Sequence, residues 1–231
     1  MLFKKKLLPR IIFLLSGLVM ILSLLLVKKS GFLRIQNIEV KTDFQFQNQK
    51  KIEQIFKPYL GKPFFFNDNE KLIKEVKNQE IKIAEVKVRK EFPGKIILEI
   101  KKRQPILAIP ADNLYFWLDS KGIIFSLEKE AKDLPLLAIE LQKIEIGSRI
   151  EIERIKIPQI LAILKQEGIR KITVLADQVQ LETGQLGLII LPKEAIEKKI
   201  GALQIILNRF RIEGKRLTKI DLRFEKPVVS F

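Results

Sequence analysis

Residues 84–101, AEVKVRKEFPGKIILEIK, contain two runs of alternating apolar and charged residues on either side of a Phe-Pro-Gly tripeptide. Successive side chains of a β-strand point to opposite faces, so each run predicts a strand with one apolar and one charged face. The turn residues 92–94 lie between the two runs and predict an antiparallel hairpin. The apolar face of this hairpin needs a cover, which the preceding residues can provide.

Two amphipathic helices are predicted upstream of the hairpin. Apolar residues at helical spacing occupy residues 52–60, and a second helix is expected after Asp68, a residue type that caps helix N-termini. A strand is expected at residues 33–42. Residues 32–103 therefore predict a small β-α-α-β-β unit whose helices cover one face of its sheet. The phenylalanines at 64–66 lie between the helices, where packing in the core is favoured over an exposed contact patch.

The remaining residues, 104–231, predict a second and larger domain. Two helices are expected to begin near Pro158 and Pro192, because proline is favoured in the first helical turn. The strands expected around them are 114–118, 122–127, 171–176, 178–182, 186–191, 217–224 and 228–231. We therefore predict an α+β fold, with this domain built on an antiparallel sheet with two helices.

Residues 11–27, IIFLLSGLVMILSLLLV, form a charge-free apolar run between basic flanks. As a helix this run is about 26 Å long, near the lower limit for the hydrocarbon core of a bilayer. A helix buried in a domain core normally keeps a polar face, and a cleaved signal peptide ends at a pair of small residues. The run has neither feature, so we predict a single uncleaved N-terminal transmembrane helix.

The charges around this helix predict its orientation. Residues 1–10 carry four basic residues and no acidic residue, which favours a cytoplasmic location for this short tail. The long C-terminal part is then expected outside the cytoplasmic membrane, in a single-pass topology. The chain has no cysteine, so the exported domains are expected to be held together by their cores alone.

The composition argues against most enzyme classes. The chain has no histidine and no cysteine, which removes imidazole and thiolate chemistry. Residues 67–70 lack the spacing of a calcium loop, and residues 184–187 lie between two predicted strands, where no helix N-terminus can bind phosphate. The net charge of +16 fits anionic lipids or wall polymers, but a solvated lysine-rich surface is favoured. We expect no catalytic residue, cofactor, metal, small-molecule substrate or nucleic acid.

Three motifs carry a resemblance to a known family. They are KEFPGKIILEIKKRQP at residues 90–105, LDSKGIIF at 118–125 and IDLRF at 220–224. By the order and spacing of these motifs the chain resembles the bacterial cell-division FtsQ/DivIB family, and its smaller unit resembles a POTRA domain. The resemblance implies a cytoplasmic tail at 1–10, a transmembrane helix at 11–27, a POTRA domain at 32–103 and an FtsQ-type β domain at 104–231.

The resemblance also implies a function. Members of this family resemble non-enzymatic scaffolds at the division septum that recruit small single-pass coiled-coil proteins, FtsB/DivIC and FtsL, and help control septal peptidoglycan synthesis. Strand addition at a terminal sheet edge is a plausible mode of binding. The candidate partner-binding residues are Arg223 and Phe224 on the penultimate strand, Val228, Val229, Ser230 and Phe231 on the last strand, and Lys198 and Lys199 on the preceding helix.

Three other functions compete with the scaffold. One is a different POTRA-bearing protein of envelope assembly, such as a chaperone of outer-membrane barrels. The second is a basic module that binds lipids or wall polymers, whose binding would fall steeply with ionic strength. The third is a membrane-anchored hydrolase that uses a pair of carboxylates, in which one Asp or Glu substitution would abolish activity without unfolding the domain.

Overall fold

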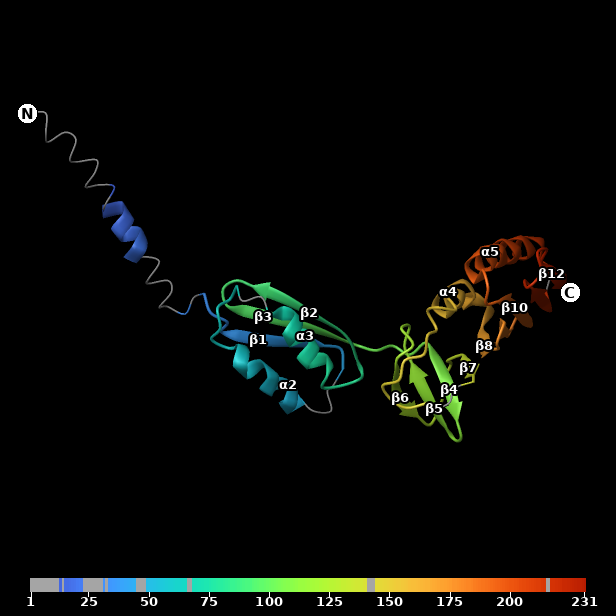
Figure 1. The fold of residues 1–231 in the computed structure, drawn as a ribbon, viewed down its shortest axis with the longest axis horizontal. Coiled ribbons are helices and arrows are strands. Elements are labelled where there is room, and N and C mark those ends of the chain that lie inside the picture. Colours follow the sequence, from blue (N-terminus) through green and yellow to red (C-terminus); the bar gives the residue numbers. More distant parts are fainter. Residues whose placement is uncertain are drawn as a thin grey trace, which may run out of the picture. The chain divides into compact units, whose positions relative to one another are not determined.

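The computed structural model describes residues 13, 15–22, 31, 33–44, 49–65, 68–140, 144–214 and 217–231. The chain divides into two compact units, and the boundary lies between Lys102 and Arg103 (Figure 1). Each unit has its own sheet and its own buried apolar cluster.

The first unit has the predicted β-α-α-β-β order. Its elements are β1 (Asn37–Thr42), α2 (Gln49–Phe56), the short 3-10 helix η1 (Lys57–Tyr59), α3 (Asn69–Lys77), β2 (Ile83–Glu91) and β3 (Lys95–Lys102). The strand order is β1-β3-β2, and the central strand β3 runs parallel to β1 and antiparallel to β2. The hairpin expected from residues 84–101 is therefore present, with β3 at the centre of the sheet.

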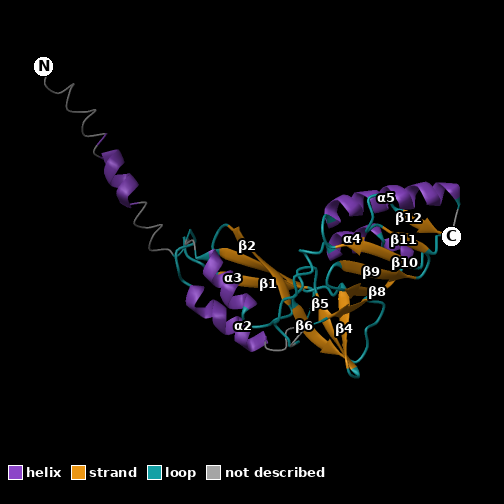
Figure 2. Cartoon of the chain, turned by 45° about the vertical axis from the view of Figure 1, so that its right-hand side comes forward, coloured by secondary structure: helices purple, strands orange, loops and turns teal. Residues whose placement is uncertain are grey.

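The two helices of this unit cover one face of the sheet (Figure 2). The apolar face of β3 consists of Ile96, Leu98 and Ile100, each at most 2% exposed. These residues belong to one buried cluster with residues of α2 and α3, among them Leu72 and Val76. Burial of this face against the two helices stabilises the alternating hairpin.

The opposite face of the same sheet is charged. Ion pairs connect neighbouring strands across it, and the Lys95 ammonium lies 2.6 Å from the Glu39 carboxylate. The hydrogen bond from Lys95 lowers the pKa of Glu39, and the same contact raises the pKa of Lys95. The remaining pairs are Lys41–Glu39, Lys87–Glu85, Arg89–Glu91, Arg89–Glu99, Lys95–Glu91 and Lys101–Glu85.

The second unit contains one nine-stranded sheet and two α-helices. Its elements are β4 (Leu107–Ala111), β5 (Leu114–Leu118), β6 (Ile124–Glu128), β7 (Leu136–Ile139), α4 (Ile157–Ile163), the 3-10 helix η2 (Lys165–Glu167), β8 (Ile169–Val174), β9 (Gln178–Thr183), β10 (Leu188–Pro192), α5 (Ile196–Glu213), β11 (Lys219–Asp221) and β12 (Val228–Ser230). The strand order is β12-β11-β10-β9-β8-β7-β4-β5-β6, so β12 and β6 are the two ends.

The prediction of a purely antiparallel sheet in this unit is wrong. The sheet is mixed, because β10 and β11, β7 and β8, and β4 and β7 are parallel pairs. Parallel neighbours need a crossover connection, and α4 and α5 provide two of these, between β7 and β8 and between β10 and β11. The helix expected to begin at Pro192 begins instead at Ile196, and Pro192 is the last residue of β10.

The turn between β5 and β6 is held by a buried carboxylate. Asp119 accepts hydrogen bonds from the backbone N–H groups of Lys121 and Ile123, each at 2.9 Å. Its other oxygen lies 2.5 Å from the guanidinium of Arg103. Gly122 completes the turn with φ +73°, in a place where a Cβ atom would lie 1.9 Å from the carbonyl oxygen of Ile150. The motif LDSKGIIF at residues 118–125 thus corresponds to a hydrogen-bonded turn.

Part of the predicted transmembrane segment, residues 11–27, can be examined in the structure. Residues 13 and 15–22 are helical, and their large apolar side chains are more than half exposed, from Leu22 at 53% to Phe13 at 79%. Among the described residues, no helix combines the length and the hydrophobicity that crossing a membrane requires. The rest of the segment and the predicted cytoplasmic tail, residues 1–10, lie outside the described residues.

The hairpin turn of the first unit gives a test of its packing. Gly94 has φ +67°, and a Cβ atom there would lie 2.6 Å from the carbonyl oxygen of Arg34. Gly94→Ala should lower the free energy of unfolding by about 2–3 kcal/mol, because a strained φ and a backbone clash act together. Gly61→Ala is the matched control: its φ is +79° but the space is open, so we expect a loss of only about 1 kcal/mol. Urea unfolding followed by circular dichroism measures both, and equal losses would contradict the clash.

Candidate functional site

The strand β12 forms one end of the nine-stranded sheet. It pairs with β11, and in the described part of the chain no strand lies on its other side. Val228 is 50% exposed and Phe231 is 66% exposed, whereas Val229 packs against the buried cluster of the second unit. An edge strand of this kind presents unpaired backbone groups next to apolar side chains.

The direction of these backbone groups follows from the hydrogen bonds. The N–H of Thr218 donates to the carbonyl of Ser230 at 2.9 Å, so that carbonyl points towards β11. Backbone groups point alternately to the two sides of a strand. The N–H and the carbonyl of Val229 therefore point to the open side, where an added strand can bind them.

Arg223 and Phe224 do not lie on the penultimate strand, so this placement in the prediction is wrong. β11 ends at Asp221, and both residues lie in the bend that leads to β12. The physical reason is the side chain of Asp221, which accepts a hydrogen bond from the backbone N–H of Arg223 at 3.1 Å. A short polar side chain that binds the backbone two residues later turns the chain away from the strand.

The side chain of Arg223 fixes the same bend. Its Nε lies 3.0 Å and its Nη2 2.7 Å from the two carboxylate oxygens of Asp221, and its Nη1 donates to the amide oxygen of Gln178 on β9 at 3.0 Å. The hydrogen bond from Arg223 lowers the pKa of Asp221, and the same contact raises the pKa of Arg223. The guanidinium also lies 5.6 Å from the centre of the Phe224 ring, which is 55% exposed.

The helix α5 contributes one of its two candidate lysines to this site. The ammonium of Lys199 donates to the backbone carbonyl of Phe224 at 2.5 Å. Lys198 occupies the preceding position on the helix, and among the described residues it makes no hydrogen bond or ion pair with the bend. The structure therefore brings Lys199, Arg223 and Phe224 together beside β12, and leaves Lys198 out of this group.

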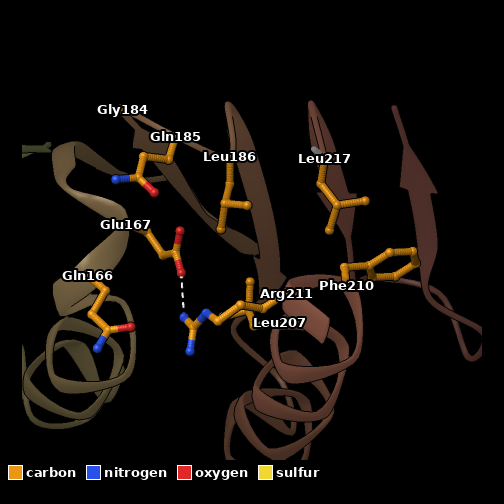
Figure 3. A pocket seen from close by; sticks show the side chains of 9 residues that line it. All are labelled: Gln166, Glu167, Gly184, Gln185, Leu186, Leu207, Phe210, Arg211 and Leu217. Carbon is orange, nitrogen blue, oxygen red and sulfur yellow. Dashed lines mark hydrogen bonds and ion pairs between the residues drawn. The ribbon is translucent and has the colours of Figure 1, made fainter. Parts of the chain in front are cut away.

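A pocket of about 370 Å³ lies next to the same edge (Figure 3). Phe210 lines it and makes an edge-to-face contact with Phe231, at 5.6 Å between ring centres. Inside the pocket the carboxylate of Glu167 lies 2.7 Å from the guanidinium of Arg211. The other lining residues are Gln166, Gly184, Gln185, Leu186, Leu207 and Leu217.

The pocket was not predicted from the sequence, because Glu167 and Arg211 are 44 residues apart and belong to no motif. η2 carries the first and the last turn of α5 carries the second. Its apolar walls, amide groups and paired charges can recognise a side chain. Within the described ranges, no three acidic, histidine or cysteine side chains gather in a way that could hold a metal ion.

The Asp221–Arg223 contact predicts a pH dependence. An ordinary aspartate has a pKa of about 3.9 in an unfolded chain, and the pKa of Asp221 is lower in the folded protein. Its stabilising contribution is therefore complete above about pH 5, about one unit above the unfolded pKa, and is lost as the pH falls through the folded pKa. Asp221→Asn should remove this acid-dependent part. As the pH is lowered, the free energy of unfolding should therefore fall less steeply for the variant than for the parent protein. Parallel curves for both proteins would contradict the assignment.

The Glu167–Arg211 ion pair predicts that replacing one partner lowers the free energy of unfolding, and that replacing the second partner as well restores most of it. Arg211→Met should destabilise the second unit by about 1–3 kcal/mol, because it leaves a carboxylate that is only 8% exposed without its partner. Adding Glu167→Leu should recover most of this loss.

Arg209→Met on the same helix is the control, since the Arg209 side chain is 74% exposed and its loss should stay within about 0.5 kcal/mol. Fluorescence of Trp117, the chain's one tryptophan, follows the urea unfolding of this unit. Purely additive losses in the double variant would contradict the pairing.

Comparisons with known proteins agree with this architecture. Residues 33–103 match the family described as the FtsQ-type POTRA domain. Over 99% of the chain and 93% of the relative, the sequence is 24% identical to the cell division protein DivIB of Clostridium botulinum strain Hall, and 23% identical to that of strain Loch Maree. The DivIB of Clostridium tetani is 24% identical over 87% of this chain and 80% of its own length. Residues 33–103 thus match the FtsQ-type POTRA domain, and over nearly its whole length the chain is similar to DivIB cell division proteins, in agreement with the resemblance to the FtsQ/DivIB family.

Proposed function

We propose that this protein is a non-enzymatic membrane scaffold of the bacterial cell-division machinery. Relatives named as cell division proteins align with nearly the whole chain, which supports a role in division. The apolar run at 11–27 and the exposed apolar side chains on its described part support a single-pass anchor in the cytoplasmic membrane. In this proposal the tail is cytoplasmic, both units lie on the outer side, and the protein acts at the division septum.

The scaffold recruits partners by strand addition to β12. The single observation that carries this step is the open edge, at which the N–H and carbonyl of Val229 point away from β11 and Val228 is half exposed. Main-chain hydrogen bonds to a partner strand provide affinity in this mode. The bend next to the edge adds selectivity, because Lys199 binds the backbone carbonyl of Phe224 and the guanidinium of Arg223 lies over its exposed ring.

The partners of this edge are small single-pass coiled-coil proteins of the FtsB/DivIC and FtsL kinds. Their recruitment brings them to the site of septal peptidoglycan synthesis, and occupancy of the edge helps control that synthesis. A scaffold needs no catalytic group for this role, which agrees with a chain that has neither histidine nor cysteine.

A backbone substitution tests strand addition directly. Val229→Pro removes the N–H that points to the open side, and it leaves the hydrogen bonds between β11 and β12 in place because proline is tolerated on edge strands in this orientation. Val229→Ala is the matched control, since it trims the side chain and keeps the N–H. Tagged full-length protein is purified in detergent from its native membranes, and recovered single-pass proteins are identified by mass spectrometry.

We expect the parent and Val229→Ala to recover the coiled-coil partners and Val229→Pro to lose most of them. Phe224→Asp should also lose them, whereas Leu127→Asp should not, because Leu127 lies on β6 at the other end of the sheet. Equal recovery by all variants would move the site away from β12. Recovery of barrel proteins, or of anionic polymer that leaves at raised salt, would overturn the division scaffold itself.

A further inference from the structure

Three aromatic residues meet at one end of the first unit, and we call them the aromatic tip: Phe64, Phe65 and Phe92. Phe64 is buried, and its ring makes edge-to-face contacts with Phe65 at 5.5 Å and with Phe92 at 5.9 Å between ring centres. The two outer rings are 68% and 57% exposed. A buried ring therefore supports two large apolar side chains that face the solvent, an arrangement that is typical of a contact surface.

The backbone places the aromatic tip beside the segment through which the chain enters this unit. The carbonyl of Leu33 accepts a hydrogen bond from the N–H of Phe64 at 2.7 Å, and the N–H of Ile35 donates to the carbonyl of Lys62 at 2.9 Å. On the other side, the N–H of Gln36 donates to the carbonyl of Gly94 at 2.7 Å. Residues 33–36 thus run between the loop that carries Phe65 and the turn that carries Phe92.

This position limits the distance between the aromatic tip and the membrane. Leu33 follows residue 27, the last residue of the apolar run, by six positions. A chain extends at most about 3.6 Å per residue, so Leu33 lies within about 22 Å of the end of the membrane helix. The headgroup region extends several ångströms beyond the hydrocarbon core, which brings both exposed rings within reach of it.

The charges near the aromatic tip fit an anionic surface. Arg34 is exposed and belongs to the segment that the tip flanks. Lys62 comes two residues before Phe64 in the same loop, and its ammonium lies 4.6 Å from the centre of the Tyr59 ring. Aromatic rings next to basic groups are the combination that binds the interface of anionic membranes.

We infer that the aromatic tip inserts Phe65 and Phe92 into the headgroup boundary of the anionic membrane and so holds the first unit against the lipid surface. The inference rests on the proposed membrane anchor and assigns a second, independent contact with the same bilayer. The ligand is the lipid surface itself, since the short tether brings that surface within reach of the two rings.

The absence of cysteine allows a clean measurement. A single thiol is introduced as Phe65→Cys, Phe92→Cys or Gln79→Cys and labelled with the environment-sensitive fluorophore NBD. Gln79 is the matched control: it is exposed in the same unit, and β2 separates it from the turn at Phe92 by about 26 Å. The full-length chain is reconstituted into vesicles of phosphatidylglycerol and phosphatidylcholine, with or without a spin-labelled lipid that quenches NBD on contact.

We expect the labels at 65 and 92 to shift to shorter wavelength and to lose most of their emission to the spin-labelled lipid, and the label at 79 to do neither. To exclude insertion driven by the label, NBD is also placed at Pro63→Cys, an exposed position in the same loop. There, quenching should disappear when Phe65→Ser and Phe92→Ser are added, while circular dichroism stays unchanged.

Flotation of the vesicles separates this inference from the proposed anchor. If the chain floats with the vesicles but the labels at 65 and 92 behave like the label at 79, the aromatic tip does not bind lipid and the anchor still stands. If the chain does not float, the anchor fails and the inference fails with it. Quenching that survives the double serine substitution would also overturn the role of the two rings.

Discussion

The crossover made by α5 determines where the second unit ends. Its buried stripe, Ile196, Ile200, Leu203 and Leu207, packs into the same apolar cluster as the central strands. Because the helix returns the chain to the starting end of β10, β11 must run parallel to β10. The last strand then pairs antiparallel with β11 at this end of the sheet. The open edge, the bend held by Lys199 and the neighbouring pocket all depend on this one packing contact.

Elements with strong periodicity could be predicted from the sequence, but the parallel pairing of distant strands could not. The hairpin of β2 and β3, the two helices that cover it and the three consecutive strands β8 to β10 follow directly from apolar spacing and turn residues. The parallel pairs of the large sheet do not, because spacing along one strand carries no information about the direction of its neighbour. The helices predicted between strands were the sequence feature that could have indicated crossover connections, and with them parallel pairs.

The candidate site could likewise be predicted from the sequence only in part. Its residues were chosen from a motif near the last two strands, and the structure shows that β12 there is an edge strand with exposed side chains, whereas Arg223 and Phe224 lie in the bend before it. The bend after Asp221 could not be foreseen, because alternation continues through Arg223 and Phe224 and only the carboxylate contact interrupts the strand. Contacts between distant residues, such as Lys199 with Phe224 or Glu167 with Arg211, leave no local pattern at all.

If partners bind by the proposed strand addition, the outward direction of the Val229 backbone has a consequence for how those partners can evolve. A contact made through main-chain groups is indifferent to most side chains of the added strand, so a partner could change its sequence there and keep its affinity. Discrimination between related partners would then fall to a few residues that meet the ring of Phe224 and the guanidinium of Arg223. Partner choice could be altered by changing this bend, without redesigning the strand that does the binding.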